Sequence, residues 1–185
     1  MFGIDLGISV SSVSCVAGSL IILDYAVLLG NKELNEWDRI TSMSNDICGT
    51  IRTMIKTNTS IKIAQMVSIE EPVYPYRTRN PRSFFIMSCL YALVRKKLQV
   101  RSFDIYSVNP QSAKATARGA FAGKNVKAKW RSGKGHMLNK DGMIEAYRRI
   151  HKEEPFWSNK VGRETLADSF FIAKTGLDRI KVGVK

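Results

Sequence analysis

Residues 1–29 read MFGIDLGISVSSVSCVAGSLIILDYAVLL, and this stretch decides the fold class. Short runs rich in β-branched and aromatic residues are separated by turn-forming positions at Gly7 and at Gly18–Ser19. Runs of this kind, interrupted by glycine and serine, are typical of consecutive strands joined by tight turns. The segment therefore predicts a three-stranded antiparallel meander.

After the meander, from Asn31 to about Lys56, apolar residues recur at helical spacing. The later segments alternate between strand-like and helix-like patterns, and they close in helices. The predicted elements are a strand in KIAQMVSIEE (62–71), a buried helix in SFFIMSCLYALV (83–94), a strand in FDIYSVNP (103–110), a short helix opening at Pro110, a helix over 140–151, and a last helix from about Gly162 to Thr175. This order predicts an α/β sandwich around a mixed sheet, in a single domain over residues 1–185.

The composition favours a polyanionic partner. The chain holds 29 Lys and Arg against 16 Asp and Glu, a net charge of +13, and such an excess binds nucleic acid through phosphate neutralisation and counterion release. Cys15, Cys48 and Cys89 lie far apart in apolar stretches, so we expect buried thiols in a reducing compartment. Without a basic leader or an apolar run of about 18 residues, we expect a soluble intracellular protein with no membrane partner, its compartment left open.

Acidic residues are scarce, so their positions are informative. Asp5 lies within the first apolar strand, where a carboxylate is costly unless it is paired or binds a cation. Gly7 follows on the same face and is expected to leave open space beside that carboxylate. Glu70 ends the strand at 62–71, with Glu71 as its rival. Each acid also has an ordinary interpretation, because Asp5 could pair with a lysine and Glu70 could simply end a strand.

Glu164 and Asp168 are four residues apart on the predicted last helix, so they share one face. Their mutual repulsion favours a metal or a basic partner between them, although a solvated helix face would show the same spacing. Two strand carboxylates and two helix carboxylates would build an all-oxygen site of the kind that Mg²⁺ prefers. Two such ions about 4 Å apart can activate water and stabilise the leaving oxygen in phosphodiester cleavage.

Three short motifs carry a family resemblance. IDLG (4–7), SIEEPVY (68–74) and LADSFFIA (166–173) resemble, in order and separation, the motifs of RuvC-type Holliday-junction resolvases. The SVNP segment (107–110) with Lys114 downstream, and the ADS tripeptide (167–169), are most similar to the poxviral and fungal mitochondrial branch.

The resemblance implies an RNase H-like fold with a mixed five-stranded sheet, a homodimer, and paired nicks across a four-way DNA junction. It assigns metal-ligand roles to Asp5, Glu70 and Asp168, with two Mg²⁺ ions per active site for which Mn²⁺ can substitute. The fourth family acid usually lies three or four residues before the last one. Thr165 stands at the first position and Glu164 at the second, so Glu164 is the expected fourth ligand.

A basic surface is predicted from two acid-free segments. Basic side chains there would hold the DNA backbone, and the interspersed aromatics Trp130, Tyr74 and Tyr76 could stack on bases. Lys114, nearest the SVNP segment, is also expected to reach the scissile phosphate as a catalytic residue. The expected DNA-binding residues are Arg77, Arg79, Arg82, Lys114, Arg118, Lys124, Lys127, Lys129, Arg131 and Lys134. The competing interpretation is a solvated loop with no specific partner.

The sequence thus favours a Mg²⁺-dependent, structure-selective DNA endonuclease acting in recombination, repair or the resolution of replicated genomes. One alternative is a non-catalytic nucleic-acid-binding module, and another is an RNase H-like nuclease that cuts RNA–DNA hybrids or other branched DNA. The actin-like ATPase fold also opens with a strand bearing Asp and Gly, but it needs two domains and a second phosphate loop. The apolar run from Phe84 to Val94 is expected to help form a two-fold interface.

Overall fold

The computed structural model describes residues 1–18, 20–58, 65–72, 81–121, 126–132, 137–152 and 159–183. All the predicted strands and helices are present in these ranges, and a short 3-10 helix, η1, is added to them. In chain order they are β1 (Phe2–Asp5), β2 (Val10–Val16), β3 (Ile22–Leu29), α1 (Glu36–Thr57), β4 (Met66–Glu70), α2 (Pro81–Gln99), β5 (Asp104–Val108), α3 (Pro110–Gly119), η1 (Ala128–Trp130), α4 (Lys140–His151) and α5 (Lys160–Lys181).

The five strands form one mixed sheet in the order β3-β2-β1-β4-β5. β1, β2 and β3 pair antiparallel, which confirms the predicted meander. β4 runs parallel to β1, and β5 runs parallel to β4. The carboxyl ends of β1, β4 and β5 therefore meet at one edge of the sheet.

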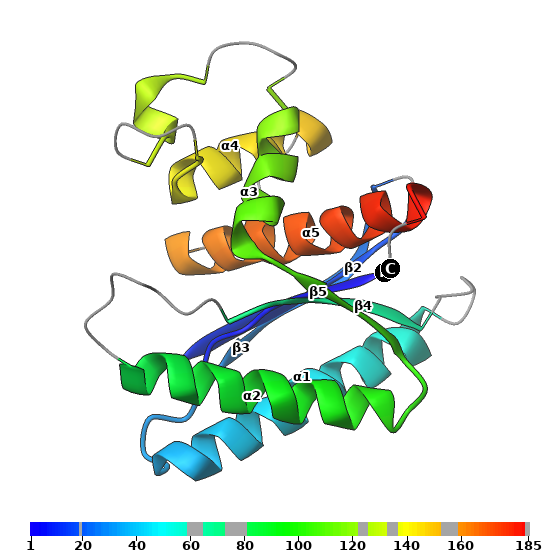
Figure 1. The fold of residues 1–185 in the computed structure, drawn as a ribbon, viewed down its shortest axis with the longest axis vertical. Coiled ribbons are helices and arrows are strands. Elements are labelled where there is room, and N and C mark those ends of the chain that lie inside the picture. The colour runs from blue at the N-terminus through cyan, green and yellow to red at the C-terminus, as the bar shows by residue number, and fades with distance from the viewer. Residues whose placement is uncertain are drawn as a thin grey trace.

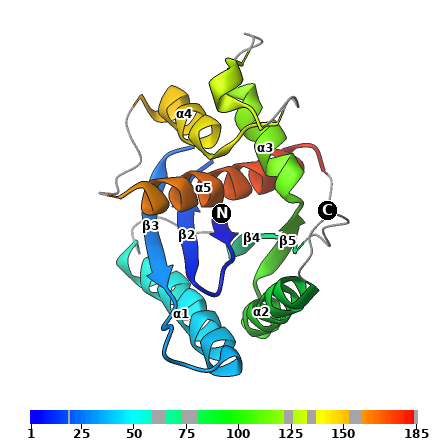
Figure 2. The same ribbon diagram turned by 90° about the vertical axis from the view of Figure 1, so that its left-hand side faces the viewer.

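One face of the sheet carries large apolar side chains, and α1 and α2 cover it (Figure 1). Phe2, Ile4, Val67 and Ile69 are fully buried there, in one cluster with residues of the two helices such as Ile47. In Figure 2 these helices lie on the opposite side of the sheet from α5. Complete burial of side chains of this size contributes about 1.5–3 kcal/mol each, so this layer is a main source of stability.

The other face is built from small residues, and α5 lies directly on it. A β-carbon at Gly3 would overlap the carbonyl oxygen of Ser169 in α5. The Ser12 hydroxyl donates a hydrogen bond to the carbonyl oxygen of Thr165 at 2.6 Å. Glycine and serine on the strands are thus what allow the α5 backbone to approach the sheet closely enough for direct contact.

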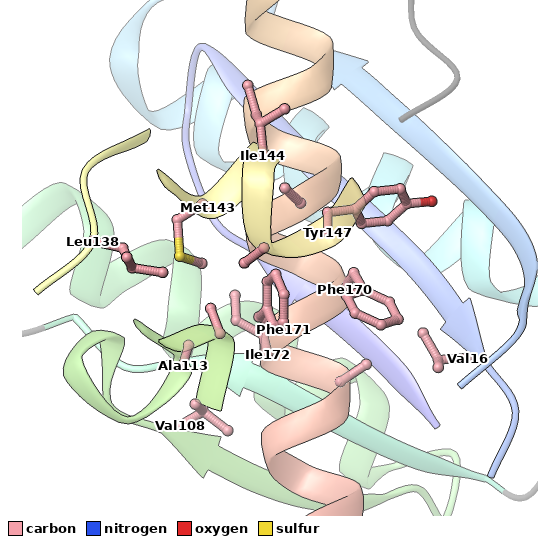
Figure 3. Close-up of a cluster of buried hydrophobic side chains, with 14 of the residues drawn as sticks. Val16, Val108, Ala113, Leu138, Met143, Ile144, Tyr147, Phe170, Phe171 and Ile172 are labelled. Carbon is pink, nitrogen blue, oxygen red and sulfur yellow. The ribbon is translucent and has the colours of Figure 1, made fainter. Parts of the chain in front are cut away.

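On its outer side, α5 is covered by α3 and α4, so that it runs between the sheet and a further helical layer (Figure 1). Phe170, Phe171 and Ile172 of α5 pack with Met143 and Tyr147 of α4 in a second buried cluster (Figure 3). Because α5 is enclosed on both sides, the position of its side chains relative to the strands is tightly determined.

Several helix boundaries differ from the predicted ones because capping side chains set them. α1 begins at Glu36, not near Asn31, since Asn35 accepts a hydrogen bond from the Asp38 amide at 3.0 Å. α5 runs from Lys160 to Lys181 and so extends past Thr175. The predicted starts of α3 at Pro110 and α4 at Lys140 are confirmed.

Two local expectations were wrong. Asp5 is the last residue of β1 and not an interior residue of the strand. Gly7 does not leave open space beside Asp5, because a β-carbon there would overlap the carbonyl oxygen of Val10. Glycine is instead required for the close turn between β1 and β2, which the Ser11 hydroxyl braces by hydrogen bonds of 3.0 Å and 2.8 Å to Gly7.

The α2 helix is covered by its own chain on one side only. Ile86, Leu90, Val94 and Leu98 are buried, whereas the Phe85 side chain is 56% exposed. The expectation that both faces of this helix are buried is therefore met by this chain for one face alone. Among the described residues, the helices are too short or too polar to cross a membrane, and Cys15, Cys48 and Cys89 are free thiols.

Candidate active site

Two of the predicted acids lie side by side at the edge where the parallel strands end. β1 and β4 pair with Ile4 opposite Ile69, so the next residues along, Asp5 and Glu70, are neighbours. Because side chains alternate along a strand, each points to the same face as the residue two positions before it. Those residues, Gly3 and Ser68, both contact α5, and the two carboxyls therefore face α5 as well.

Asp168 comes to the same place from α5. Burial, and next the nearby charge of Glu70, raise the pKa of Asp168 from 3.8 to about 7. Burial, followed by the charges of Asp168 and Glu70, raises the pKa of Asp5 well above its ordinary value. The structure thus brings together three acids that are far apart in the sequence, as predicted.

Asp5 and Glu70 share a hydrogen bond, which raises the pKa of Asp5 and lowers that of Glu70. Burial is the larger influence on Glu70, and it raises the Glu70 pKa overall. These directions describe a protonated Asp5 carboxyl that donates to the Glu70 carboxylate. Glu70 and not its rival Glu71 is the partner; Glu71 is one residue further on and its amide donates to the carbonyl oxygen of Val108 at 2.9 Å.

Two lysines bring positive charge to the acids. Lys114, on α3, lowers the pKa of both Glu70 and Asp168 through its charge, which places it by the acids as predicted. Lys140, the first residue of α4, lowers the pKa of Asp5 and Asp168 in the same way. The sequence placed Lys140 only in the basic segment. Asn139 before it signals a helix cap, but no local signal says that this helix end faces the acids.

Glu164 is held by lysines. Its carboxylate accepts from Lys140 Nζ at 3.0 Å and lies 3.8 Å from Lys160 Nζ, and its side chain is only 10% exposed. It still adds to the raised pKa of Asp168, so the two helix acids do share a face. A role for Glu164 as the fourth metal ligand stays a prediction.

The oxygen-only donor set fits a hard divalent cation such as Mg²⁺ or Mn²⁺. Three buried carboxyls cannot all ionise together without added positive charge, and here a proton on Asp5 supplies part of the compensation. In their present positions, no three Asp, Glu, His or Cys side chains of the described ranges stand close enough to enclose a metal ion. The site is therefore an acid cluster with the right chemistry, in a protonated state.

The predicted DNA-binding residues are spread over several surfaces. Lys127 and Lys129 lie over the ring of Trp130, with Nζ 5.7 Å and 5.1 Å from its centroid. Arg118 is exposed on α3, and Arg131 follows η1. Arg82 pairs with Glu36 at 3.1 Å, at the start of α2. Arg77, Arg79, Lys124 and Lys134, as well as Tyr74 and Tyr76, lie outside the described residues.

No model of a known protein family matches the sequence, and no curated protein matches it. Two solved structures resemble the fold over nearly the whole chain. Thermus thermophilus RuvC is 19% identical, with a TM-score of 0.67, over 99% of this chain and 96% of that chain. T. thermophilus RuvC in complex with Holliday junction substrate is 17% identical, with a TM-score of 0.65, over 98% and 94% of the two chains.

At this identity the likeness shows the fold. The chain has an α/β RNase H-like fold with a mixed five-stranded sheet, as predicted, and it shares that fold with RuvC. Both matched structures come from T. thermophilus, so they lend no support to the predicted poxviral and fungal mitochondrial branch.

Proposed function

We propose that this chain is a Mg²⁺-dependent endonuclease that cleaves four-way DNA junctions by paired nicks, in recombination, repair or the resolution of replicated genomes. The observation that carries the proposal is the meeting of Asp5, Glu70 and Asp168 at one sheet edge, with Lys114 and Lys140 beside them. The RNase H-like fold adds support, since a protein that shares it was crystallised with Holliday junction substrate.

Asp5, Glu70 and Asp168 would hold the metal, with Glu164 as the candidate fourth ligand. When bound, Mg²⁺ supplies activation of the attacking water and stabilisation of the leaving oxygen. The carboxyls supply an acidic pocket that burial makes dependent on a cation: burial raises the pKa of Asp5 and of Asp168, so full ionisation at neutral pH requires added positive charge.

The two lysines have a separate task, which is to attract and position phosphate. A DNA strand that approaches the acids adds negative charge to a site already rich in it, so cations at its rim are needed. Lys140 is 68% exposed at its side chain, although it is bonded to Glu164, and it can therefore reach an incoming phosphate. Lys114 lies on the other bordering helix, α3, which begins directly after β5.

Paired nicks require two active sites, and a homodimer would supply them. The face of α2 that its own chain leaves uncovered carries Phe85 and Ala92, both exposed. Exposed aromatic side chains are enriched in subunit interfaces, and a two-fold axis would make this face self-complementary. We therefore place the dimer contact along α2.

The proposal is tested with end-labelled four-way junction, linear duplex and RNA–DNA hybrid, each with and without Mg²⁺. We expect symmetric nicks in the junction only, and only with metal. Cleavage of the hybrid in preference to the junction would assign a different RNase H-like activity. Tight binding of junction without cleavage in either Mg²⁺ or Mn²⁺ would indicate a non-catalytic binding module.

A further inference from the structure

A second basic site lies outside the acid cluster, in a pocket of about 370 Å³ between η1, α4 and α5. Trp130 and Ile144 supply its apolar lining, and its volume falls in the range of ordinary ligand sites. Its polar lining consists of four cations, Lys129, Arg148, Lys160 and Arg163, and of one acid, Asp141.

The charge of this pocket, called here the Trp130 pocket, is strongly positive. Asp141 is engaged with Lys160 at 3.5 Å, and both side chains remain mostly exposed. Arg148 has Glu145 at 4.0 Å, but that carboxylate is also bound by Arg149 at 3.0 Å. One acid in the lining and one shared acid beside it do not neutralise four cations, so the pocket attracts an anion.

The cations around Trp130 are also held in position by its ring. Lys127 and Lys129 lie within 5.7 Å and 5.1 Å of its centroid, and the Arg149 guanidinium carbon lies at 5.4 Å. Such cation–π contacts restrict long side chains before a ligand arrives, which lowers the entropy lost on binding. The indole therefore organises the basic residues, and its face is not open for stacking on a base.

The Trp130 pocket adjoins the acid cluster. Glu164 is held between Lys160 of the pocket at 3.8 Å and Lys140 of the cluster at 3.0 Å. Arg163 and Lys160 precede Asp168 on α5, about 7.5 Å and about 12 Å along an axis that rises 1.5 Å per residue. A DNA strand advances about 3.4 Å per nucleotide, so the pocket is about two to four phosphates from the acids.

We propose that the Trp130 pocket binds a backbone phosphate of the strand being cut, about two to four nucleotides from the scissile phosphate. The cations take the phosphate, and Trp130 with Ile144 contacts the sugar. The site rests on the proposed function and deepens it, because it sets the register of the strand in the acid cluster without contacting the reacting atoms. Neither Arg148, Lys160 nor Arg163 belongs to the basic segments that the sequence singled out.

The test measures binding of a four-way junction without divalent cation, with one phosphate at a time replaced by an uncharged methylphosphonate near the branch point. In the wild-type protein, one replacement two to four nucleotides from the cut should weaken binding roughly tenfold, about the value of one charge-assisted contact. In the Arg148→Gln/Arg163→Gln variant that replacement should have no effect, and the slope of log K against log salt should flatten by about 0.9 for the lost phosphate contact.

The matched control is Arg52→Gln/Lys56→Gln, which removes two charges from exposed positions of α1, in the layer across the sheet from α5. It should keep the wild-type response. Lys129→Gln, an exposed change on η1, repeats the test if the double variant folds poorly. An equal methylphosphonate response in wild type and both pocket variants overturns the proposal.

Cleavage of the junction together with such an equal response would leave the proposed nuclease function standing without this pocket. A methylphosphonate response that depends on Arg148 and Arg163, in a protein that cuts no DNA, would support the pocket and overturn the nuclease function.

Discussion

At the scale of single residues, the chemistry depends on buried carboxyls that share protons. Asp5 and Glu70 are joined by a hydrogen bond, and Asp168 adds a third negative group. Such a cluster is unfavourable for the folded chain by itself and favourable once a cation is bound. This opposition between stability and function makes the acids separately testable.

Asp5→Asn should reduce cleavage of a four-way junction by at least roughly 100-fold, the usual effect of losing one preorganised transition-state contact. Junction binding should stay the same or tighten, because the change removes negative charge beside phosphate. Asp104→Asn, at the opposite end of the sheet on an exposed position, is the control and should cleave normally. Equal loss of binding and cleavage in Asp5→Asn would point to a folding role instead.

Asp168→Asn tests the cost of the cluster. Its folded-state pKa is about 7 against an ordinary value of 3.8, so the folded chain binds this proton more tightly than the unfolded chain. Without metal, stability should therefore fall as pH rises from about 4 to about 7 and then level off. The variant lacks this loss and should be more stable than wild type at pH 8, by up to roughly 4 kcal/mol, but not at pH 4.

Thermal unfolding at both pH values measures this difference, and Mg²⁺ at pH 8 should raise the Tm of wild type more than that of the variant. Parallel curves of Tm against pH for wild type and Asp168→Asn would contradict the assigned burial of this carboxyl.

At the scale of elements, the site depends on how closely α5 lies on β1 and β4. Gly3 on β1 and Gly176 on α5 are the points of approach, since a β-carbon at either would overlap Ser169 or Ser68. A wider spacing would move Asp168 away from Asp5 and Glu70. The small residues of this face therefore serve the site as well as the packing.

Gly3→Ala should destabilise the fold by about 1–3 kcal/mol, the usual cost of overpacking, and should lower cleavage beyond what the lost stability explains. Gly49→Ala is the matched control: Gly49 lies inside α1 with open space around it, so alanine there should stabilise by up to about 1 kcal/mol. Urea titration compares the two variants, and a neutral Gly3→Ala would mean that α5 does not rest on the strand as closely as described.

At the scale of the whole molecule, the net charge of +13 is distributed so that cations border the acid cluster from α3, α4 and η1. The α1 and α2 layer lies across the sheet from them (Figure 2). One side is thus suited to DNA and the other to a second copy of the chain. This division underlies the paired-nick proposal.

Phe85→Asp should shift the protein from dimer to monomer in light scattering, because it places a charge in the proposed interface. Ile21→Asp, at a comparably exposed apolar position in the β2–β3 turn (58% against 56% exposed), should leave the assembly unchanged. The monomeric variant should still nick a junction singly but should lose the paired cuts. A wild-type protein that is monomeric at high concentration would contradict the interface.

The sequence by itself determined the order of elements, the meander and the identity of the three clustered acids. These features depend on local patterns: alternation for strands, helical spacing for α1 and α5, and a carboxylate where an apolar strand ends, as at Glu70. A proline at the start of α3 and an asparagine cap before α4 carried the same kind of local information. Such patterns survive in a chain without matches to any family model.

Only the tertiary structure decided which acids share a proton, that Lys140 faces them, and that Glu164 is held between two lysines. It also joined Arg148, Lys160 and Arg163 with Lys129 around one pocket. The reason is physical: contacts between α4, α5 and the ends of β1 and β4 join residues far apart in the sequence. Their distances depend on how closely helices pack on a sheet, and that spacing is set by small residues such as Gly3, whose role a single sequence does not reveal.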